Sequence, residues 1–391
     1  MSSRLIVNSI RHTGASGDAV TLANDGTCTA KITNNLSNRR ININGAMTIA
    51  QRGTSSTSTG YKTVDRFYNG STGTDEGPTF AQVDVASGTT PYTLGFRKAL
   101  KLTNGNQTSG AGATDTVYIE HQMEAQDIAN SGWNYTSSSS YITLSFWVKS
   151  SVAQDFKGYL RSVDGTSQIY PYSTGSLSAD TWTKITKTIP GNSNLTFDND
   201  NGSGLQLYLW PYIGTDYTDA GVTENAWAAY ASGTRTPVST TTWYTTNDAT
   251  LEITGIQLEV GDHATDFEHR SFADELRRCQ RYYFKLTGDD NDFLLSGFTY
   301  SASLYWFIVN FPQVMRAFPT YTGSATAARF YSDNPSQDFN FSTLVNGGVN
   351  HTTTYPSHMW LQADQGGANA GAGGSLQAQN AVGTLEFSAE L

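Results

Sequence analysis

Residues 140–151, SYITLSFWVKSS, alternate between apolar and polar side chains, and this period of two constrains the fold more than any other feature. In a strand with one buried face, successive side chains point to opposite sides of the sheet. The residues that would share the buried side here are Ile142, Leu144, Phe146 and Val148. Comparable runs lie at 99–104, 115–123, 157–163, 180–191, 204–213 and 249–261. Turns rich in Gly, Asn, Asp and Ser separate these runs, so an antiparallel β-sandwich is predicted.

The composition excludes several classes of partner. The formal net charge is −10 and no run of Lys or Arg occurs, which argues against a nucleic-acid partner, because phosphate binding needs clustered cations. No stretch approaches the ~18 apolar residues of a membrane span, and the N-terminus lacks the apolar core of a signal peptide. We therefore expect synthesis in a cytoplasm and no membrane insertion.

Cys28 and Cys279 lie far apart and predict free thiols, since two lone cysteines make neither a disulfide framework nor a zinc site.

The chain divides into two large β blocks with a short segment before each. Residues 1–36 hold a few strand-like residues, with Leu5, Val7 and Ile10 as the apolar positions of the first run. These strands are too few for an independent core, so the segment needs a neighbour. That neighbour could be the downstream domain, other copies of the chain or a host structure, and we favour an attachment segment. The main block covers 37–270, with long insertions at 53–95 and 214–247 that we expect to be surface loops.

One charged stretch, SFADELRRCQRYYFKL at 271–286, interrupts the β pattern. Ser271 is a good N-cap, acidic residues occupy the first turn and arginines the last, as the helix dipole favours. The predicted apolar stripe consists of Phe272, Leu276, Cys279 and Tyr283. The pattern predicts a helix over 271–285 that joins the first block to a second β domain over 286–391.

Several stretches resemble a group of tailed-bacteriophage virion proteins. The stretches of this chain that carry the resemblance are NRRININGAMTIAQRGTS, YKTVDRFY, FPQVMRAFPTYT and the terminal LEFSAEL. The most specific one is LEITGIQLEVGDHATDFEHRSFADELRRCQRYYFK. The similarity runs from about residue 38 to the C-terminus. Such proteins are described as tail fibres or appendages with a jelly roll like that of carbohydrate-binding modules. Residues 1–36 resemble the docking start of such fibres.

The resemblance implies an all-β virion protein with a docking segment, a central jelly roll and a C-terminal β domain. It also implies a homotrimer assembled in the host cytoplasm, whose partners are other virion proteins and host surface polysaccharide. No catalytic motif accompanies it. A purely structural part of the capsid or tail remains the alternative, and a depolymerase is a third class.

Aromatic residues after the 204–213 run and in the 214–247 insertion are the candidate glycan-binding residues. Sugar recognition uses flat aromatic faces together with amide and carboxylate groups. The candidates are Trp210, Tyr212, Tyr217, Trp227, Trp243 and Tyr244. The alternative is that these side chains pack within the loop or against a neighbouring protomer.

Metal and catalytic signals are weaker. FDNDNGSG at 197–204 resembles a calcium-binding loop, but Gly202 occupies the fifth position, where the pattern requires an oxygen ligand. GDDNDF at 288–293 is an acidic turn. We expect turns at both sites, with structural calcium as the alternative and no other cofactor. His263 and His269 flank the GDHATDFEH run without a nucleophile motif. A structural hydrogen bond, with Asp266 or Glu268 as the possible partner of His269, is therefore the better interpretation.

Overall fold

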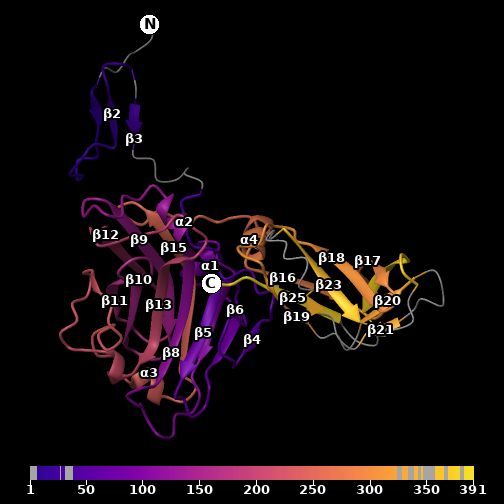
Figure 1. Cartoon of the computed structure of the whole chain (residues 1–391). Helices are drawn as coiled ribbons and strands as arrows, with labels where there is room; N and C mark the ends of the chain where they lie inside the picture. The colour runs from indigo at the N-terminus through magenta and orange to yellow at the C-terminus, as the bar shows by residue number, and fades with distance from the viewer. Residues whose placement is uncertain are drawn as a thin grey trace.

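The computed structural model describes residues 7–26, 28–30, 38–323, 328–332, 339–341, 345–346, 357–364, 369–378 and 383–391. Strands dominate these residues, and the helices are short. Figure 1 shows a small N-terminal sheet, a central two-layered domain and a C-terminal domain beside it. The predicted all-β class with a central jelly-roll sandwich is confirmed.

Two six-stranded antiparallel sheets form the central jelly roll (Figure 1). The first sheet, here called the platform sheet, contains in spatial order β14 (Ala228–Ala229), β11 (Gln168–Ser176), β10 (Asp155–Ser162), β13 (Ser203–Ile213), β8 (Thr116–Glu124) and β5 (Phe67–Thr72). The second sheet contains β12 (Thr183–Pro190), β9 (Tyr141–Ser150), β15 (Thr250–Val260), β7 (Lys98–Thr103), β6 (Thr79–Asp84) and β4 (Ser55–Ser56).

The core lies between these sheets and follows the predicted alternation. Ile142, Leu144, Phe146 and Val148 of β9 are all buried, and Val148 lies opposite Ile253 of β15 in the antiparallel register. Burying each such side chain contributes about 2 kcal/mol from the apolar area removed from water. The sandwich therefore rests on the side-chain period that the sequence displays.

The insertion at 53–95 is not the surface loop that we expected. It contributes β4, β5 and β6 to the two sheets and the short helix α1 (Thr90–Thr93). Phe67 and Phe80 are buried in the core. The sequence signal is weak here because each strand is only six residues or shorter.

The insertion at 214–247 is mostly irregular and adds only a two-residue edge strand to the platform sheet. It contains a 3-10 turn, η1 (Thr215–Tyr217), the two-residue strand β14 and the short helix α3 (Thr242–Thr245). Another short helix, α2 (Ala125–Ala129), directly follows β8 at one end of the platform sheet.

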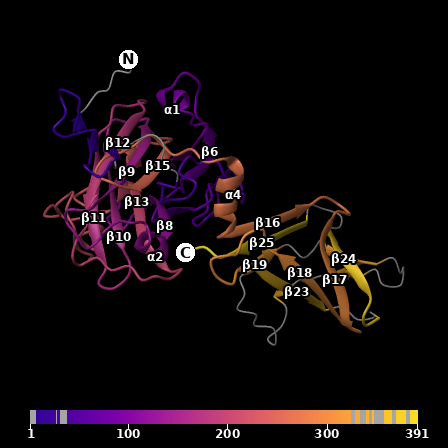
Figure 2. The same ribbon diagram turned by 90° about the horizontal axis from the view of Figure 1, so that it is seen from above.

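The charged stretch forms helix α4 (Phe272–Gln280), which Figure 2 shows between the two β domains. Ser271 is the predicted N-cap, and its hydroxyl accepts the N–H of Asp274 at 3.1 Å. Such a cap contributes about 1 kcal/mol because it satisfies a donor that the helix leaves free. The local sequence therefore specifies where this helix begins.

The predicted apolar stripe of α4 is wrong at both ends. Cys279 is buried and Leu276 packs beside it against Ile43 of the jelly roll. Phe272, however, is 64% exposed, and Tyr283 belongs to the following strand because the helix ends at Gln280. Besides these apolar contacts, Glu275 in the first turn pairs with Arg40 of the jelly roll and accepts the N–H of Asn44 at 2.5 Å.

The C-terminal domain consists of two antiparallel sheets. The three-stranded sheet contains β16 (Tyr283–Gly288), β25 (Gly383–Ser388) and β19 (Thr320–Gly323). The seven-stranded sheet contains β21 (Phe339–Phe341), β20 (Ala328–Tyr331), β24 (Gly373–Ala378), β17 (Phe293–Ser301), β18 (Leu304–Asn310), β23 (His358–Asp364) and β22 (Val345–Asn346). Tyr305, Phe307 and Val309 of β18 are fully buried in the core of this domain.

The described side chains of the N-terminal sheet form no buried core. It consists of β1 (Ser9–Ile10), β2 (Val20–Leu22) and β3 (Cys28–Ala30), and Figure 1 shows it standing apart from the jelly roll. Where burial is described between residues 7 and 28, no residue is buried, and Ile10 is 52% exposed. Val7 is half-buried, and Leu5 lies outside the described residues. The docking role of Leu5, Val7 and Ile10 stays a prediction.

A buried carboxylate near the end of the chain ties the C-terminal domain to the jelly roll. Glu390 pairs with Arg66, and with Arg52 at 3.1 Å. The Arg66 side chain is 1% exposed. It lies over the Tyr282 ring at 3.4 Å and donates to the backbone carbonyl of Gln122 at 2.6 Å. Arg66 adopts a left-handed backbone (φ 73°), a conformation that other contacts must stabilise.

A second buried carboxylate acts at the same junction. Glu124 accepts two hydrogen bonds from Arg281, at 2.6 and 2.7 Å, and one from the Tyr282 hydroxyl at 2.5 Å. Hydrogen bonds from these two residues keep the pKa of Glu124 below its usual value despite burial. A bidentate arginine–carboxylate pair fixes orientation as well as distance, so the end of α4 is locked to the end of β8.

Replacing Glu390 with glutamine should destabilise the protein by about 3 kcal/mol, because it leaves the buried Arg66 guanidinium without its counter-charge. Urea-induced unfolding of Glu390→Gln and of wild type measures this difference. The matched control is Glu252→Gln. The Glu252 carboxylate pairs with Lys149 at 2.9 Å within the second sheet of the jelly roll. Equal losses in the two variants would contradict a special role for the Glu390 junction.

Candidate functional site

The outer face of the platform sheet carries a band of aromatic side chains, here called the aromatic strip. Its members are Tyr68 of β5, Tyr118 of β8, Tyr208 and Trp210 of β13, and Tyr159 of β10. Their sequence neighbours Phe67, Ile119 and Leu209 lie in the core between the sheets. Since side chains alternate along a strand, the strip faces away from that core.

The strand register places the strip beside polar side chains of the same face. Glu120 lies opposite Tyr68 on one side and Tyr208 on the other, and Tyr208 lies opposite Tyr159. Two residues further along the strands, on the same face, Gln206 lies between Gln122 and Arg161. Four neighbouring strands therefore present aromatic rings, a carboxylate, amides and a guanidinium together.

The rings of the strip form a continuous series. Tyr68 and Tyr118 are nearly parallel, with ring centroids 6.1 Å apart, and Tyr118 is 5.7 Å from Tyr208. Tyr208 is in turn 4.6 Å from Tyr159 and 5.6 Å from Trp210. Mutual contacts of this kind hold each ring in place before any ligand arrives.

A glycine shapes the middle of the strip. Gly70 of β5 pairs with Tyr118 in the register, and a Cβ at Gly70 would lie 2.2 Å from the Tyr118 ring. The ring can therefore lie across the neighbouring strand only because position 70 has no side chain. Glycine within a strand commonly marks such a close approach.

The 214–247 insertion covers one end of the strip. Tyr217 and Tyr230 pack against Tyr159 and Trp210, both of which are 2% exposed. Cation–π contacts fasten this cover, with Arg161 over Tyr230 at 3.8 Å and Arg235 over Tyr217 at 4.5 Å. The accessible part of the strip therefore consists of the half-buried Tyr208, Tyr118 and Tyr68.

The polar groups of the strip are not fully satisfied by the protein. Burial raises the pKa of Glu120 although hydrogen bonds with Tyr208 and Gln122 oppose the shift. Gln206 Oε1 and Trp210 Nε1 are buried and make no hydrogen bond within the described part of the chain. Buried polar atoms without partners are uncommon in folded proteins. Ordered water can supply the missing partners.

The structure separates the six aromatic residues that the sequence singled out. Trp210, Tyr212, Trp243 and Tyr244 are at most 2% exposed, so they pack within the protein, and a glycan contact for these four stays a prediction. The Tyr212 and Tyr244 rings stack 4.3 Å apart, because α3 turns the end of the insertion back into the sandwich. Aromatic residues in a loop can therefore complete a core.

Tyr217 and Trp227 are the two remaining candidates, and both are half-buried. The Trp227 ring lies against Tyr170, and its Nε1 donates to the Pro190 carbonyl at 2.7 Å. Tyr217 lies beneath Arg235. These contacts explain their positions within the protein, and a glycan contact for either remains a prediction.

Sequence reasoning missed Tyr68, Tyr118 and Tyr208. The signal was present in two strands, where Tyr208 and Trp210 alternate with core leucines and Tyr118 alternates with Val117 and Ile119. What the sequence does not show is that β5, β8 and β13 are neighbours.

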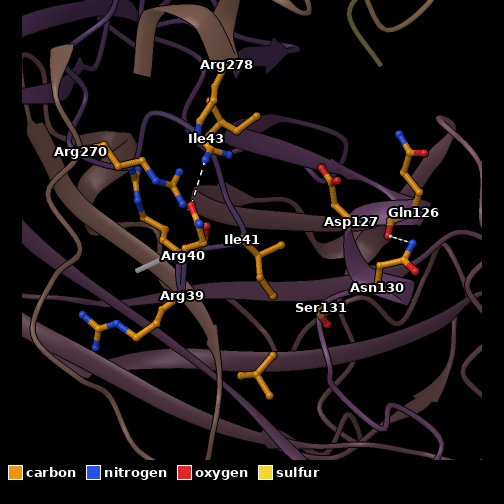
Figure 3. A pocket seen from close by; sticks show the side chains of 12 residues that line it. Arg39, Arg40, Ile41, Ile43, Gln126, Asp127, Asn130, Ser131, Arg270 and Arg278 are labelled. Carbon is orange, nitrogen blue, oxygen red and sulfur yellow. Dashed lines mark hydrogen bonds between the residues drawn. The ribbon is translucent and has the colours of Figure 1, made fainter. Parts of the chain in front are cut away.

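A cleft of about 720 Å³, here called the arginine cleft, lies beside α2 (Figure 3). Arg39, Arg40, Arg270 and Arg278 line one side, and Gln126, Asp127, Asn130 and Ser131 line the other. Arg278 donates to the Asn38 side chain at 3.2 Å.

The arginines of this cleft are largely committed to internal carboxylates. Arg40 pairs with Glu275, and Arg270 lies 3.5 Å from Glu268. Glu268 also accepts the backbone N–H groups of Asn38 and Arg40 at 2.6 and 2.7 Å. Burial, together with Arg40 and Arg278, lowers the pKa of Arg270 to about 10. These contacts join the start of the jelly roll to its exit, so the cleft is a structural junction.

The histidine and acidic motifs have structural partners. His269 Nε2 lies 2.9 Å from the Leu94 carbonyl, so its partner is neither Asp266 nor Glu268. Asp200 accepts the Gly202 N–H at 2.8 Å, and Asp292 accepts the Asp289 N–H at 2.9 Å, which are turn contacts. Within the described ranges, no three His, Cys, Asp or Glu side chains are grouped to hold a metal.

Comparisons with known proteins give only distant structural similarity. No protein-family model matches the chain, and neither does any curated protein. The enzymatically active domain of tailspike protein 4 from bacteriophage CBA120 is 10% identical with a TM-score of 0.29, over 56% of this chain and 22% of that one. The cellulose-binding domain of Cellulomonas fimi β-1,4-glucanase C is 11% identical with a TM-score of 0.26, over 55% and 99%.

A family 11 carbohydrate-binding module from Clostridium thermocellum, in complex with a mixed-linked tetrasaccharide, is 12% identical with a TM-score of 0.24. It covers 52% of this chain and 91% of its own. Similarities of this size carry no argument about function. Among the described residues, no helix has the length and apolar character to cross a membrane.

Replacing Glu120 with glutamine should stabilise the protein in a pH-dependent manner. The folded pKa of Glu120 is raised by burial, so its carboxyl favours the fold only while protonated, and that contribution is lost as the pH rises through the raised pKa. Glu120→Gln should therefore gain stability over wild type near about pH 8 but not near about pH 4. Urea unfolding at both values measures the gain, and an equal difference at the two would contradict a strained carboxylate in the strip.

Proposed function

We propose that this protein is a non-catalytic bacteriophage appendage that binds host surface glycans through the aromatic strip. The observation that carries the proposal is the set of three accessible tyrosines, Tyr68, Tyr118 and Tyr208, arranged around Glu120 on one sheet face.

The chemistry of the strip suits a carbohydrate. A sugar ring offers C–H faces that pack on aromatic rings and hydroxyl groups that need hydrogen-bond partners. Tyr118 and Tyr208 provide ring surface, and Glu120 and Gln206, which are 6% and 9% exposed, lie on the same sheet face. Because the rings are fixed by contacts with one another, little side-chain freedom is lost on binding.

Attachment to a virion is supported by the other end of the molecule. The sheet formed by β1, β2 and β3 stands apart from the jelly roll and exposes Ile10 and Leu22. Three short strands without a core need a partner to be stable. A docking site on the particle, or the same sheet from two further copies of the chain, would cover these side chains. The sequence resemblance to phage appendages favours both.

A purely structural virion protein is the second candidate. The coreless N-terminal sheet favours it equally, because assembly alone would explain that segment. This candidate gives no role to the accessible tyrosines or to the unpartnered Gln206 oxygen. Binding to glycans therefore separates the two.

Trimer formation should be visible for the purified full-length protein. We expect light scattering to give three times the mass of the chain, since association covers the exposed apolar residues of the N-terminal sheet. A monomer at all accessible concentrations would contradict the trimer. The exposed apolar residues of the N-terminal sheet would then be covered by docking on the virion.

Tyr208→Ala should weaken glycan binding about tenfold or more, which corresponds to about 1.4 kcal/mol. The probe is an array of bacterial capsular polysaccharides and O-antigens, read with fluorescently labelled protein. Tyr68→Ala repeats the test at a second half-buried ring of the strip. The matched control is Tyr300→Ala, since Tyr300 is a 57% exposed tyrosine of the C-terminal domain.

Circular dichroism and thermal melting must show that each variant is folded. Binding by wild type that Tyr208→Ala and Tyr68→Ala abolish, and Tyr300→Ala preserves, supports the proposal. Folded strip variants that bind like wild type would place recognition elsewhere, and a wild type that binds no glycan would favour the structural candidate.

A further inference from the structure

A groove between the jelly roll and the C-terminal domain continues the aromatic strip. This interdomain groove has a volume of about 520 Å³. Its walls come from both domains, and the lining residues that matter here are Ser56, Tyr61, Tyr68, Tyr283, Thr322 and Glu386. Tyr68 thus belongs to the strip and also lines the groove.

The rings connect the two sites without interruption. The Tyr61 ring meets Tyr68 edge to face with centroids 5.3 Å apart, and Tyr68 leads on to Tyr118 at 6.1 Å. From Tyr118 the series reaches Tyr208 at 5.7 Å. A ligand lying along the accessible rings of the strip is therefore directed towards the groove.

The groove is lined by the same kinds of groups as the strip. Ser56 and Thr322 offer hydroxyls, and Thr322 lies opposite Glu386 in the register of β19 and β25. Glu386 is 35% exposed at its side chain and lies 3.8 Å from Lys285. Hydroxyl and carboxylate groups beside aromatic rings form the polar and apolar contacts that sugars need.

The groove is held in shape by buried contacts. Arg52 lies over the Tyr283 ring at 3.6 Å and pairs with Glu390 at 3.1 Å. The Tyr61 hydroxyl reaches the Leu391 carbonyl at 3.4 Å. Both contacts cross from the jelly roll to the C-terminal domain, so the two walls do not depend on a ligand to come together.

We propose that the interdomain groove is a second glycan subsite, and that the ligand is an extended oligosaccharide chain bound along the strip and the groove together. A single terminal sugar would occupy only one of the two. This inference rests on the proposed glycan-binding function and adds the class of ligand, because a continuous site that ends between two domains fits a chain of several units.

The test measures binding of size-fractionated O-antigen and capsular oligosaccharides, from a single repeating unit upward, to the full-length protein. Thr322→Arg and Thr59→Arg fill the groove from its two walls, and both positions are exposed. The control is Thr186→Arg, at an exposed threonine of β12 in the other sheet. All variants keep the residues of the strip.

We expect the affinity of wild type to rise with chain length, and the two groove variants to bind the long oligosaccharides about tenfold more weakly. Their binding of a single repeating unit, and all binding by Thr186→Arg, should remain at the wild-type level. Wild type that binds short and long fragments equally, or groove variants that bind long fragments normally, would overturn the second subsite while leaving the strip intact. Wild type that binds no oligosaccharide would overturn the proposed function itself.

Discussion

The pairing of Glu390 with Arg66 and Arg52 is the interaction on which the arrangement of the two large domains depends. It brings the last residues of the chain back to the jelly roll and buries two arginines against a carboxylate. Removing one partner of such a pair is costly because the other charge remains buried. With the domains fixed in this way, Tyr283 and Thr322 face Tyr61 and Tyr68 across a groove. A freely hinged C-terminal domain would provide no such wall.

The platform sheet serves two purposes because its side chains alternate. Phe67, Ile119 and Leu209 point into the core and stabilise the sandwich, while Tyr68, Tyr118 and Tyr208 point outward and remain partly accessible. The same strand geometry therefore fixes the core and the candidate binding face. The outward groups are less well satisfied than those of the core, as the raised pKa of Glu120 and the unpartnered Gln206 oxygen indicate. Such local cost is expected at a functional surface, which is the role proposed for the strip.

The sequence predicts the fold where the signal is local. The alternation in β9 and the N-cap at Ser271 depend on residues close in the chain, and both are observed. The strip depends on which strands are neighbours, and no period in the sequence reports that β5 lies beside β8. The same limit explains why the sequence did not predict the burial of Trp243 and Tyr244, which depends on the path of a long insertion. Composition identified aromatic residues as the relevant chemistry but not which of them are accessible.

The most direct test of the central claim is hydrogen–deuterium exchange of the full-length protein with and without the bacterial polysaccharide that gives the strongest signal on the glycan array. Exchange reports locally which backbone amides a ligand protects. A ligand on the aromatic strip should slow exchange in β5, β8 and β13, and in the segment around Tyr61, while β12 of the opposite sheet remains unchanged. Protection confined to the opposite sheet or to the N-terminal sheet would contradict recognition by the strip.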